Sequence, residues 1–317
     1  MTSPLFRLYK EAGWHTTANV NPRGKAVLEH NPHVDDILLH EDDSVPNEKL
    51  DEHWANLAKG YDRVVNLSGS IEKGLLKTKA DEEYIWPKLK RHLACDVNYY
   101  DRTLEIGGFV GMKGLNGELF FSPEEERWGR MIREQHARRF LVLWSLSGSS
   151  VHKSYPYAEL VAKAFLDQHS DAVFFTVGEQ LCRLLEFDHP HAKRRSGVWG
   201  IRKSFIMTKY SDLVVGPETG VLNAAGCFET PKIVMLSHSS HENLSKHWKN
   251  CYPVEAEERE APCHPCHKLI YSLDECPVNK AVKSPVCMAH LRPEKILNAM
   301  EKVYAQWKEA RRGSLCR

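Results

Sequence analysis

One stretch, residues 212–248, constrains the fold of this chain more than any other. A short apolar strand is expected at 213–215, followed by a sharp turn at Gly216-Pro217, a helix at 221–227 and a second apolar strand at 233–236. This order is typical of an open parallel α/β sheet, in which ligands lie at the carboxyl ends of the strands. The free N–H groups of a helix N-terminus favour an anion, so residues 218–220 are a candidate anion site.

The remainder of the chain also alternates between strands and helices. Further strands are expected at 16–20, 34–39, 63–67, 140–144 and 172–177. Helices are expected at 4–12, 25–30, 50–58, 80–93, 122–136, 156–168, 179–187, 202–210 and 293–312, with loops at 107–119 and 188–200. Because this rhythm restarts after Arg138-Arg139, two Rossmann-like α/β domains are predicted, 1–137 and 138–317. The second includes a Cys-rich segment, 251–287, and the amphipathic helix 293–312.

Charge and hydropathy exclude several classes of protein. The net charge of +1 gives no electrostatic case for nucleic acid. We expect no transmembrane segment, since no apolar run approaches the roughly 20 residues that span a bilayer. The first residues do not form a signal peptide. We therefore expect a cytoplasmic protein, with peripheral attachment to the inner face of the membrane as an alternative.

Three short motifs follow expected strands and carry groups that suit a nucleotide. The first is a Ser/Gly loop ending in a lysine, the second an acid-hydroxyl-glycine turn, and the third an acid directly after a strand. Their candidate ligands are Ser147, Ser149, Lys153, Glu218, Thr219, Gly220 and Glu179. Small residues let backbone N–H groups approach a phosphate, lysine adds charge, and a carboxylate binds a ribose diol. The alternative is an ordinary Ser-rich loop with two helix caps, and the Walker A spacing is absent.

Cysteine and histidine side chains gather in the C-terminal third. The spacing Cys263-x2-Cys266-x9-Cys276-x10-Cys287 is compatible with a structural zinc site of four thiolates. Free or paired thiols are the alternative, and Cys251, His264 and His267 are competing ligands. The histidines after the strand 233–236 are expected to line a polar loop near the ligand crevice rather than to bind metal: His238, His241 and His247.

Taken in order, these motifs resemble glycosyltransferase family 9, the family of ADP-heptose:lipopolysaccharide heptosyltransferases. The resemblance is carried by Ser147-Gly148-Ser149 with Lys153-Ser154-Tyr155-Pro156, by Val177-Gly178-Glu179, by the segment 214–226 and by the cysteine-bearing tail before Leu291-Arg292-Pro293-Glu294. It covers residues 139–306 well and residues 3–67 weakly.

The resemblance implies the glycosyltransferase B fold, with two Rossmann-like domains facing a cleft and a last helix that crosses back to the first domain. It implies inverting transfer of a sugar from a nucleoside-diphosphate donor to a glycan or lipid-linked acceptor, without a catalytic metal. Ser147, Ser149, Lys153, Thr219 and Gly220 would hold the diphosphate, Glu179 the ribose, and Glu218 the donor sugar or phosphates. An ADP-sugar is expected from the resemblance alone.

Two departures leave other functions open. Asn223 replaces the histidine that usually stands three residues after the signature glycine. The family's first strand and Gly-Asp turn, which carry its expected general base, would precede Met1. The catalytic residue is therefore unknown, and a protein that binds a nucleotide sugar without turnover is the main alternative. A nucleotide-sugar 2-epimerase is the third candidate.

Overall fold

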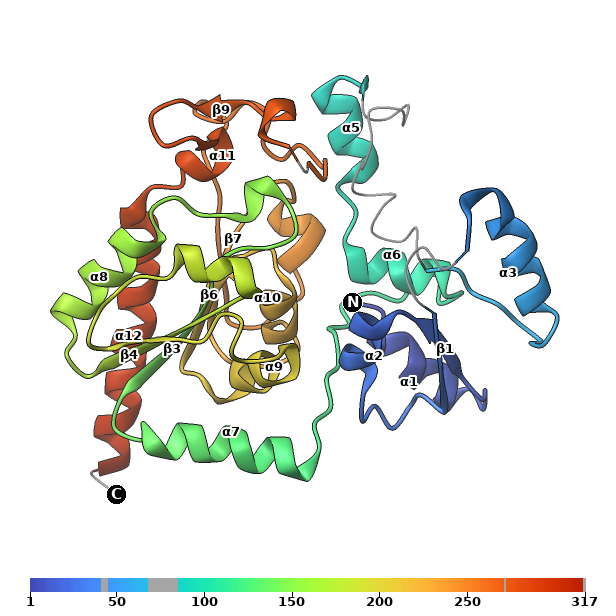
Figure 1. Ribbon diagram of the computed structural model, residues 1–317, viewed down its shortest axis with the longest axis horizontal. Coiled ribbons are helices and arrows are strands. Elements are labelled where there is room, and N and C mark those ends of the chain that lie inside the picture. Colours follow the sequence, from blue (N-terminus) through green and yellow to red (C-terminus); the bar gives the residue numbers. More distant parts are fainter. Residues whose placement is uncertain (41–44, 68–84, 271, 316–317) are drawn as a thin grey trace.

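The computed structural model describes residues 1–40, 45–67, 85–270 and 272–315. Two parts lie side by side, a smaller N-terminal part and a larger C-terminal part built on one sheet (Figure 1). Among the described residues, no helix is both long enough and apolar enough to cross a membrane.

The C-terminal part is a six-stranded, all-parallel sheet with the order β5-β4-β3-β6-β7-β8. Its strands are β3 Phe140–Ser145, β4 Ala172–Val177, β5 Ala192–Arg194, β6 Leu213–Pro217, β7 Lys232–Met235 and β8 Cys251–Val254. β3, β4, β6 and β7 are buried along their whole length, as sheets covered on both faces are. These four strands were predicted. The loop expected at 188–200 was wrong in part, because it contains the edge strand β5.

Helices cover both faces of this sheet, and alternate residues of β3 supply the two cores. Phe140, Val142 and Trp144 pack with α8 (Ala158–Gln168) and α12 (Pro293–Leu315). Leu141 and Leu143 pack with α9 (Ile201–Tyr210) and α10 (Gly220–Ala225). The helices are η3 Val151–Lys153, α8 Ala158–Gln168, η4 Gln180–Leu185, α9 Ile201–Tyr210, α10 Gly220–Ala225, η5 His241–Ser245, η6 Leu273–Glu275, α11 Val286–Ala289 and α12 Pro293–Leu315. The segment expected as an α-helix at 179–187 is the 3-10 helix η4.

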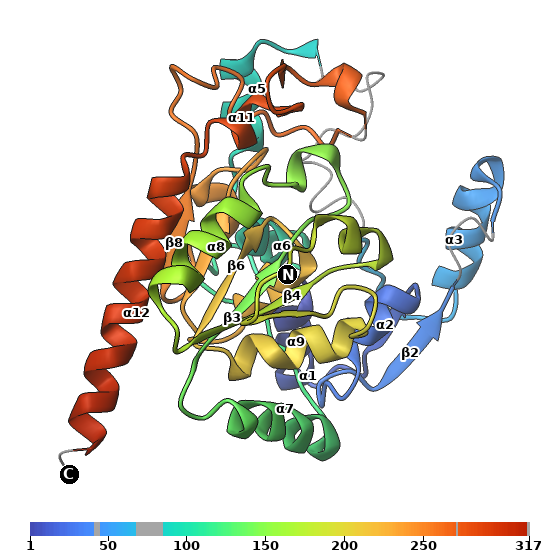
Figure 2. The same cartoon turned by 60° about the vertical axis from the view of Figure 1, so that its left-hand side comes forward.

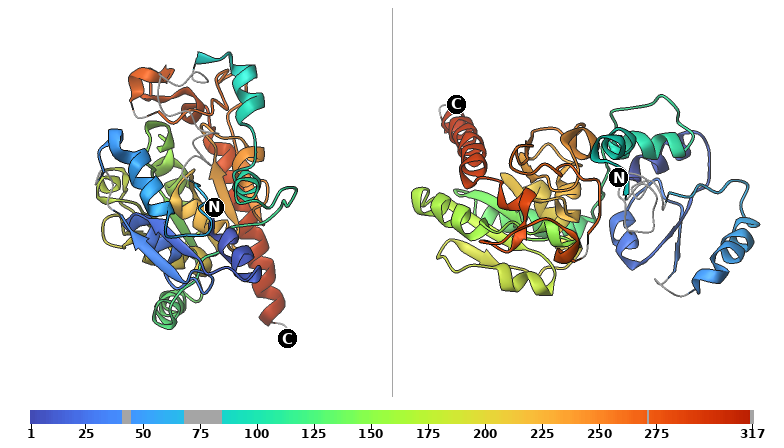
Figure 3. Two further views of the ribbon diagram at one scale, coloured as in Figure 1. Left: turned by 90° about the vertical axis from the view of Figure 1, so that its right-hand side faces the viewer. Right: turned by 90° about the horizontal axis from the view of Figure 1, so that it is seen from above.

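The last helix, α12, runs along one side of the C-terminal part (Figure 2). It packs on α8, β7 and β8, and near its end Arg311 donates to the carbonyl oxygen of Ala137 at 2.6 Å. Figure 3 shows α12 at the end of the molecule away from β1. The contact of Arg311 with Ala137 joins the end of α12 to the last residue of the predicted first domain.

The N-terminal part holds a two-stranded parallel sheet of β1 and β2. Its elements are α1 Ser3–Glu11, β1 Thr17–Val20, α2 Pro22–Leu28, β2 Asp36–Leu39, η1 Asn47–Lys49, α3 Leu50–Ala58, α5 Lys88–Cys95, α6 Tyr99–Ile106 and α7 Pro123–Gln135. The strand expected at 63–67 was wrong, since these residues have no regular secondary structure. The helix expected at 80–93 is α5 in its described portion, residues 80–84 lie outside the described residues, and α6 was not predicted.

Contacts between the two parts are extensive. Tyr99 and Tyr100 of α6 are buried in the same core as Leu141, and α7 packs on α9. The Arg202 guanidinium donates to Glu125, to the carbonyl oxygen of Ala26 at 3.0 Å and to that of Phe120 at 2.8 Å. The boundary after residue 137 stays a prediction, and α7, which precedes it, packs on a helix that follows it.

Candidate functional site

The strand order places three of the predicted motifs at one edge of the sheet. β4, β3 and β6 are adjacent and parallel, so the segments after residues 145, 177 and 217 emerge side by side. The strand order reverses between β3 and β6. After β3 the chain adds β4 and β5 on one side of the sheet, and from β6 it adds β7 and β8 on the other side. Such a topological switch point is where open α/β sheets bind ligands.

The loop after β3 folds back on itself. Ser147 and Ser154 form an antiparallel bridge with their hydroxyl oxygens 2.6 Å apart, and the N–H of Gly148 donates to the carbonyl oxygen of Lys153 at 3.2 Å. Ser149 is exposed at the tip. These two contacts hold the predicted phosphate loop in its folded-back conformation.

Gly148 brings the first two motifs together. A Cβ atom at this position would lie 2.7 Å from Cδ of Lys153 and 3.2 Å from Cγ2 of Thr219. A larger residue would push the lysine side chain or the loop away from Thr219. The structure therefore confirms that the Ser/Gly loop, Lys153 and Thr219 are neighbours, although their sequence positions are far apart.

Thr219 has the capping role that was weighed as the alternative. Its hydroxyl accepts from the N–H of Leu222 at 3.4 Å and lies 3.0 Å from the hydroxyl oxygen of Ser145. Gly220, the first residue of α10, is exposed. Asn223 lies one turn further on, and its Oδ1 is buried without a hydrogen-bond partner among the described residues.

Glu218 is buried, with its side chain 4% exposed, and both carboxylate oxygens are engaged. Oε1 accepts from the N–H groups of Ser237 at 3.1 Å and Ser239 at 3.0 Å, and Oε2 accepts from the Ser237 hydroxyl at 2.8 Å and from Nδ1 of His238. Burial would raise the pKa of Glu218, but His238 and the charge of Lys153 outweigh it and hold the pKa well below its usual range. The carboxylate therefore fixes the loop that follows β7.

Two buried histidines and the half-buried Lys153 complete this cluster. The rings of His152 and His238 are 4.7 Å apart, and burial, then the neighbouring His238, lowers the pKa of His152 to about 3. Burial also lowers the pKa of His238 and of Lys153, while the charge of Glu218 opposes both shifts. No hydrogen bond from Nζ of Lys153 is found within the described part of the chain. His152 belongs to the predicted motif but was not predicted as a site residue.

Glu179 lies apart from this cluster. Its side chain is 81% exposed, and Oε1 is 3.5 Å from Nη2 of Arg23 on α2. The predicted ribose ligand thus faces an arginine from the N-terminal part that the sequence did not single out. The sequence does show that a basic residue, Arg23, follows the turn at Asn21-Pro22. It does not show that Glu179 lies opposite this arginine.

The other histidines of the loop after β7 are engaged in polar contacts. Nδ1 of His241 is 2.9 Å from the Ser245 hydroxyl oxygen, and Nε2 of His247 is 2.9 Å from Asp101. This agrees with the prediction of a polar loop.

The four cysteines of the predicted zinc site come together. Val278 pairs with Pro285 between β9 Val278–Asn279 and β10 Ser284–Pro285, and this antiparallel register places Cys276 opposite Cys287. Burial raises the pKa of Cys266 to about 12, and the nearby Cys263 and Cys276 add to it. All four are free thiols in the structure. Among the described residues, no three of these sulfur atoms form a group within 4.8 Å, so zinc there stays a prediction.

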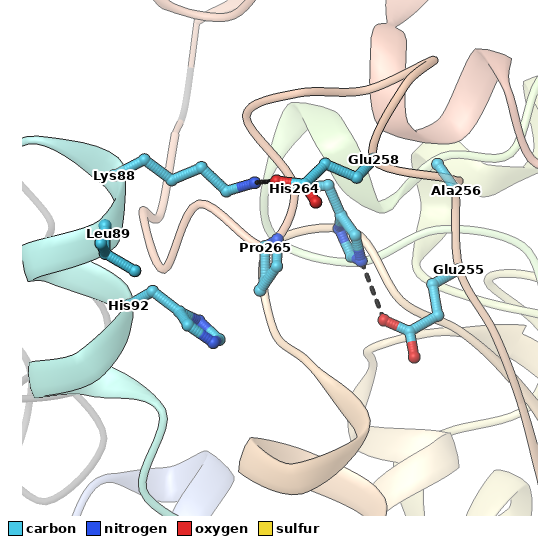
Figure 4. Close-up of a pocket in the computed structure, with 8 residues that line it drawn as sticks. All are labelled: Lys88, Leu89, His92, Glu255, Ala256, Glu258, His264 and Pro265. Carbon is cyan, nitrogen blue, oxygen red and sulfur yellow. Dashed lines mark hydrogen bonds and ion pairs between the residues drawn. The ribbon is translucent and has the colours of Figure 1, made fainter.

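A pocket of about 400 Å³ lies between α5 and the residues before Cys266 (Figure 4). Its lining residues are Lys88, Leu89, His92, Glu255, Ala256, Glu258, His264 and Pro265. Nζ of Lys88 donates to Glu258 at 2.9 Å, and Nε2 of His264 is 3.0 Å from Glu255. The pocket therefore lies between the N-terminal and the C-terminal part of the molecule.

No family model matches the chain, and no curated protein matches it significantly. Two solved structures match almost all of it. The family 9 glycosyl transferase from Veillonella parvula DSM 2008 matches with a TM-score of 0.65 at 12% sequence identity. The match covers 96% of this chain and 93% of the Veillonella chain. The E. coli ADP-heptose lps heptosyltransferase II has a TM-score of 0.59 at 13% identity, with 97% and 95% covered. The chain therefore has the GT-B-like α/β fold of family 9 glycosyltransferase structures, which confirms the fold that the sequence motifs predicted.

Proposed function

We propose that the protein is a glycosyltransferase that uses a nucleoside-diphosphate sugar. One observation carries the proposal: Lys153 and its Ser/Gly loop pack against Thr219 at the switch point between β3 and β6. The shared fold with family 9 structures supports it. We further propose heptosyltransferase-like, inverting transfer to a glycan or lipid-linked acceptor by a cytoplasmic protein.

In this proposal the diphosphate lies over the loop after β3. Lys153 supplies positive charge, while Ser147, Ser149, Gly220 and neighbouring backbone N–H groups donate hydrogen bonds. Neutralising the diphosphate stabilises the leaving group as negative charge develops on it during transfer. Asn223 has a buried, unpartnered oxygen one turn away, which suits a hydroxyl of the donor.

We assign Glu218 a positioning role rather than direct donor contact. Its oxygens already accept from Ser237, Ser239 and His238, and its charge faces Lys153. The carboxylate would keep Lys153 charged in a buried setting. Glu179 remains the proposed ribose ligand, with Arg23 beside it.

Incubation with ADP-, UDP- and GDP-sugars tests the proposal through the release of nucleoside diphosphate. We expect release from one nucleotide class, and a rate at least about tenfold lower for Lys153→Ala, a loss of about 1.4 kcal/mol of transition-state stabilisation. Lys163→Ala is the matched control, because Lys163 pairs with Glu159 on the outer face of α8. Tight nucleotide-sugar binding without release would instead establish a binding protein, and the absence of both would refute the proposal.

A further inference from the structure

Three metal-ligating side chains from distant parts of the chain meet beside the pocket of Figure 4. His92 and Asp96 stand four residues apart at the end of α5, and His267 lies in the loop after Cys266. Their ligand atoms all lie within 4.8 Å of one another. Among the described residues, this is the one group of three or more such side chains that meets this limit.

The distances suit a bound ion better than a hydrogen-bonded relay. Nδ1 of His92 is 2.9 Å from Nε2 of His267, but the Asp96 oxygens are 3.6 Å from Nε2 of His92 and 3.8 Å from Nε2 of His267. The last two separations are too long for hydrogen bonds. An imidazole binds an ion through one nitrogen, so the contacts of Nδ1 and Nε2 of His92 are alternatives. The 3.8 Å between Asp96 and Nε2 of His267 is close to the roughly 3.4 Å that separates ligand atoms about 2.1 Å from a tetrahedral zinc ion.

The backbone that carries these ligands is held from both parts of the molecule. On α5, the buried Arg91 donates from Nε to the carbonyl oxygen of Cys266 at 2.8 Å. The N–H of His267 donates to the carbonyl oxygen of His238 at 2.9 Å. The loop that bears His267 is therefore fixed both to α5 and to the segment after β7.

The end of α5 is fixed in the same way. Asn243 is fully buried, and its Nδ2 donates to the carbonyl oxygens of Cys95 at 3.3 Å and Val97 at 2.7 Å, the residues on either side of Asp96. The Ser240 hydroxyl donates to the carboxylate of Asp96. Metal sites in proteins commonly have such outer partners, which orient the ligands before an ion binds.

The hydrogen bonds of the three side chains leave part of their bonding capacity unused. His267 is fully buried, and its Nδ1 has no hydrogen-bond partner among the described residues. No lysine or arginine is paired with Asp96 within the same described part of the chain. A cation between the three groups would compensate the carboxylate charge, and His267 would bind it through Nε2, the nitrogen that faces His92 and Asp96.

We propose that His92, Asp96 and His267 form a binding site for a divalent ion of the zinc class. Two imidazoles and one carboxylate leave one tetrahedral position for water or for an oxygen atom of a ligand. The ion would tie α5 to the loop after Cys266, across the two parts of the chain. The site is separate from the four cysteines and does not depend on the proposed glycosyltransferase activity.

Metal-stripped full-length protein titrated with Zn²⁺ and Co²⁺ tests this site. In a Cys276→Ser background, which removes one thiolate of the predicted cysteine site, we expect one ion per chain to bind by calorimetry. Asp96→Asn and His92→Gln each remove a direct ligand of the ion. Each should therefore weaken ion binding by more than the roughly 10- to 100-fold that loss of an outer partner costs. His53→Gln on α3 is the matched control and should bind normally.

A variant that replaces His92 with another metal-binding residue separates loss of the ligand from misfolding of the protein. His92→Cys, in the same background, should retain Co²⁺ and show a stronger thiolate-to-cobalt charge-transfer band than the parent, in which only Cys263, Cys266 and Cys287 remain at the cysteine site. Circular dichroism would confirm that each variant folds. The proposal is overturned if the Cys276→Ser protein binds no ion, if ion binding is unchanged in His92→Gln, or if folded His92→Cys shows no stronger band than the parent.

Discussion

Burial of the Glu218 carboxylate changes the role that can be assigned to it. From sequence, an acid before Thr219-Gly220 was expected to touch the donor. In the structure its oxygens are saturated by the N–H groups of Ser237 and Ser239 and by His238. The sequence places Glu218 at the end of β6, but it does not show which groups the loop after β7 presents to its carboxylate.

His152 provides a test of the electrostatics of this cluster. It faces His238, Glu218 and Lys153, and its pKa is lowered from 6.5 to about 3 by burial and by His238. The folded protein therefore keeps His152 neutral while the unfolded chain takes up a proton below pH 6.5. Stability contributed in this way is present above pH 6.5 and is lost as the pH falls toward 3.

We therefore expect His152→Gln to flatten the dependence of unfolding free energy on pH. The slope between pH 6 and 4 should decrease by about 1 kcal/mol per pH unit, the value for one proton. Urea unfolding at several pH values measures it. An equal slope in His152→Gln and the parent would mean that His152 is not held neutral by the fold.

At the scale of elements, the segment that contains β9 and β10 shows what the spacing of cysteines can and cannot predict. The intervals between Cys263, Cys266, Cys276 and Cys287 suggested a common site, and the β9–β10 register brings the last two opposite each other. The group with the shortest ligand separations, His92, Asp96 and His267, combines residues about 170 positions apart. Only the i, i+4 spacing on α5 was visible in the sequence.

Zinc at the cysteines is predicted to stabilise the segment that contains β9 and β10. Cys276→Ser should reduce the zinc content of the purified protein by about one ion per chain, and it should lower the melting temperature. Elemental analysis and thermal unfolding measure both. Cys182→Ser, outside this segment, is the control. Equal zinc content in Cys276→Ser and the parent would contradict a zinc ion at these thiolates.

At the scale of the whole molecule, the central sheet was predictable and its edges were not. Apolar, fully buried strands such as β3 and β6 stand out in a sequence. The edge strand β5, with the sequence Ala-Lys-Arg, has no such pattern, because the sheet pairs its backbone while its side chains are only half-buried or exposed. Conversely, Arg63–Leu67 has an apolar pattern typical of a strand, but Arg63 instead bonds to Gly107.

Arg202 joins α9 to the N-terminal part and should contribute measurably to the stability of the whole protein. Its side chain, 14% exposed, donates to Glu125 and to the carbonyl oxygens of Ala26 and Phe120. Arg202→Lys keeps the charge but loses the planar fork, so we expect about 2–4 kcal/mol of destabilisation in denaturant unfolding. The exposed Arg183→Lys should change stability by less than about 0.5 kcal/mol. Equal stability of both variants would rule out this role.

Calorimetric titration with ADP, UDP and GDP tests most directly whether the switch point between β3 and β6 binds a nucleoside diphosphate. We predict that the parent and Lys163→Ala bind one of these nucleotides equally well. Lys153→Ala and Thr219→Val should each lose about 1–3 kcal/mol of binding free energy, the scale of a charge-assisted hydrogen bond. Unchanged affinity in Lys153→Ala would contradict the assignment of this loop to the diphosphate.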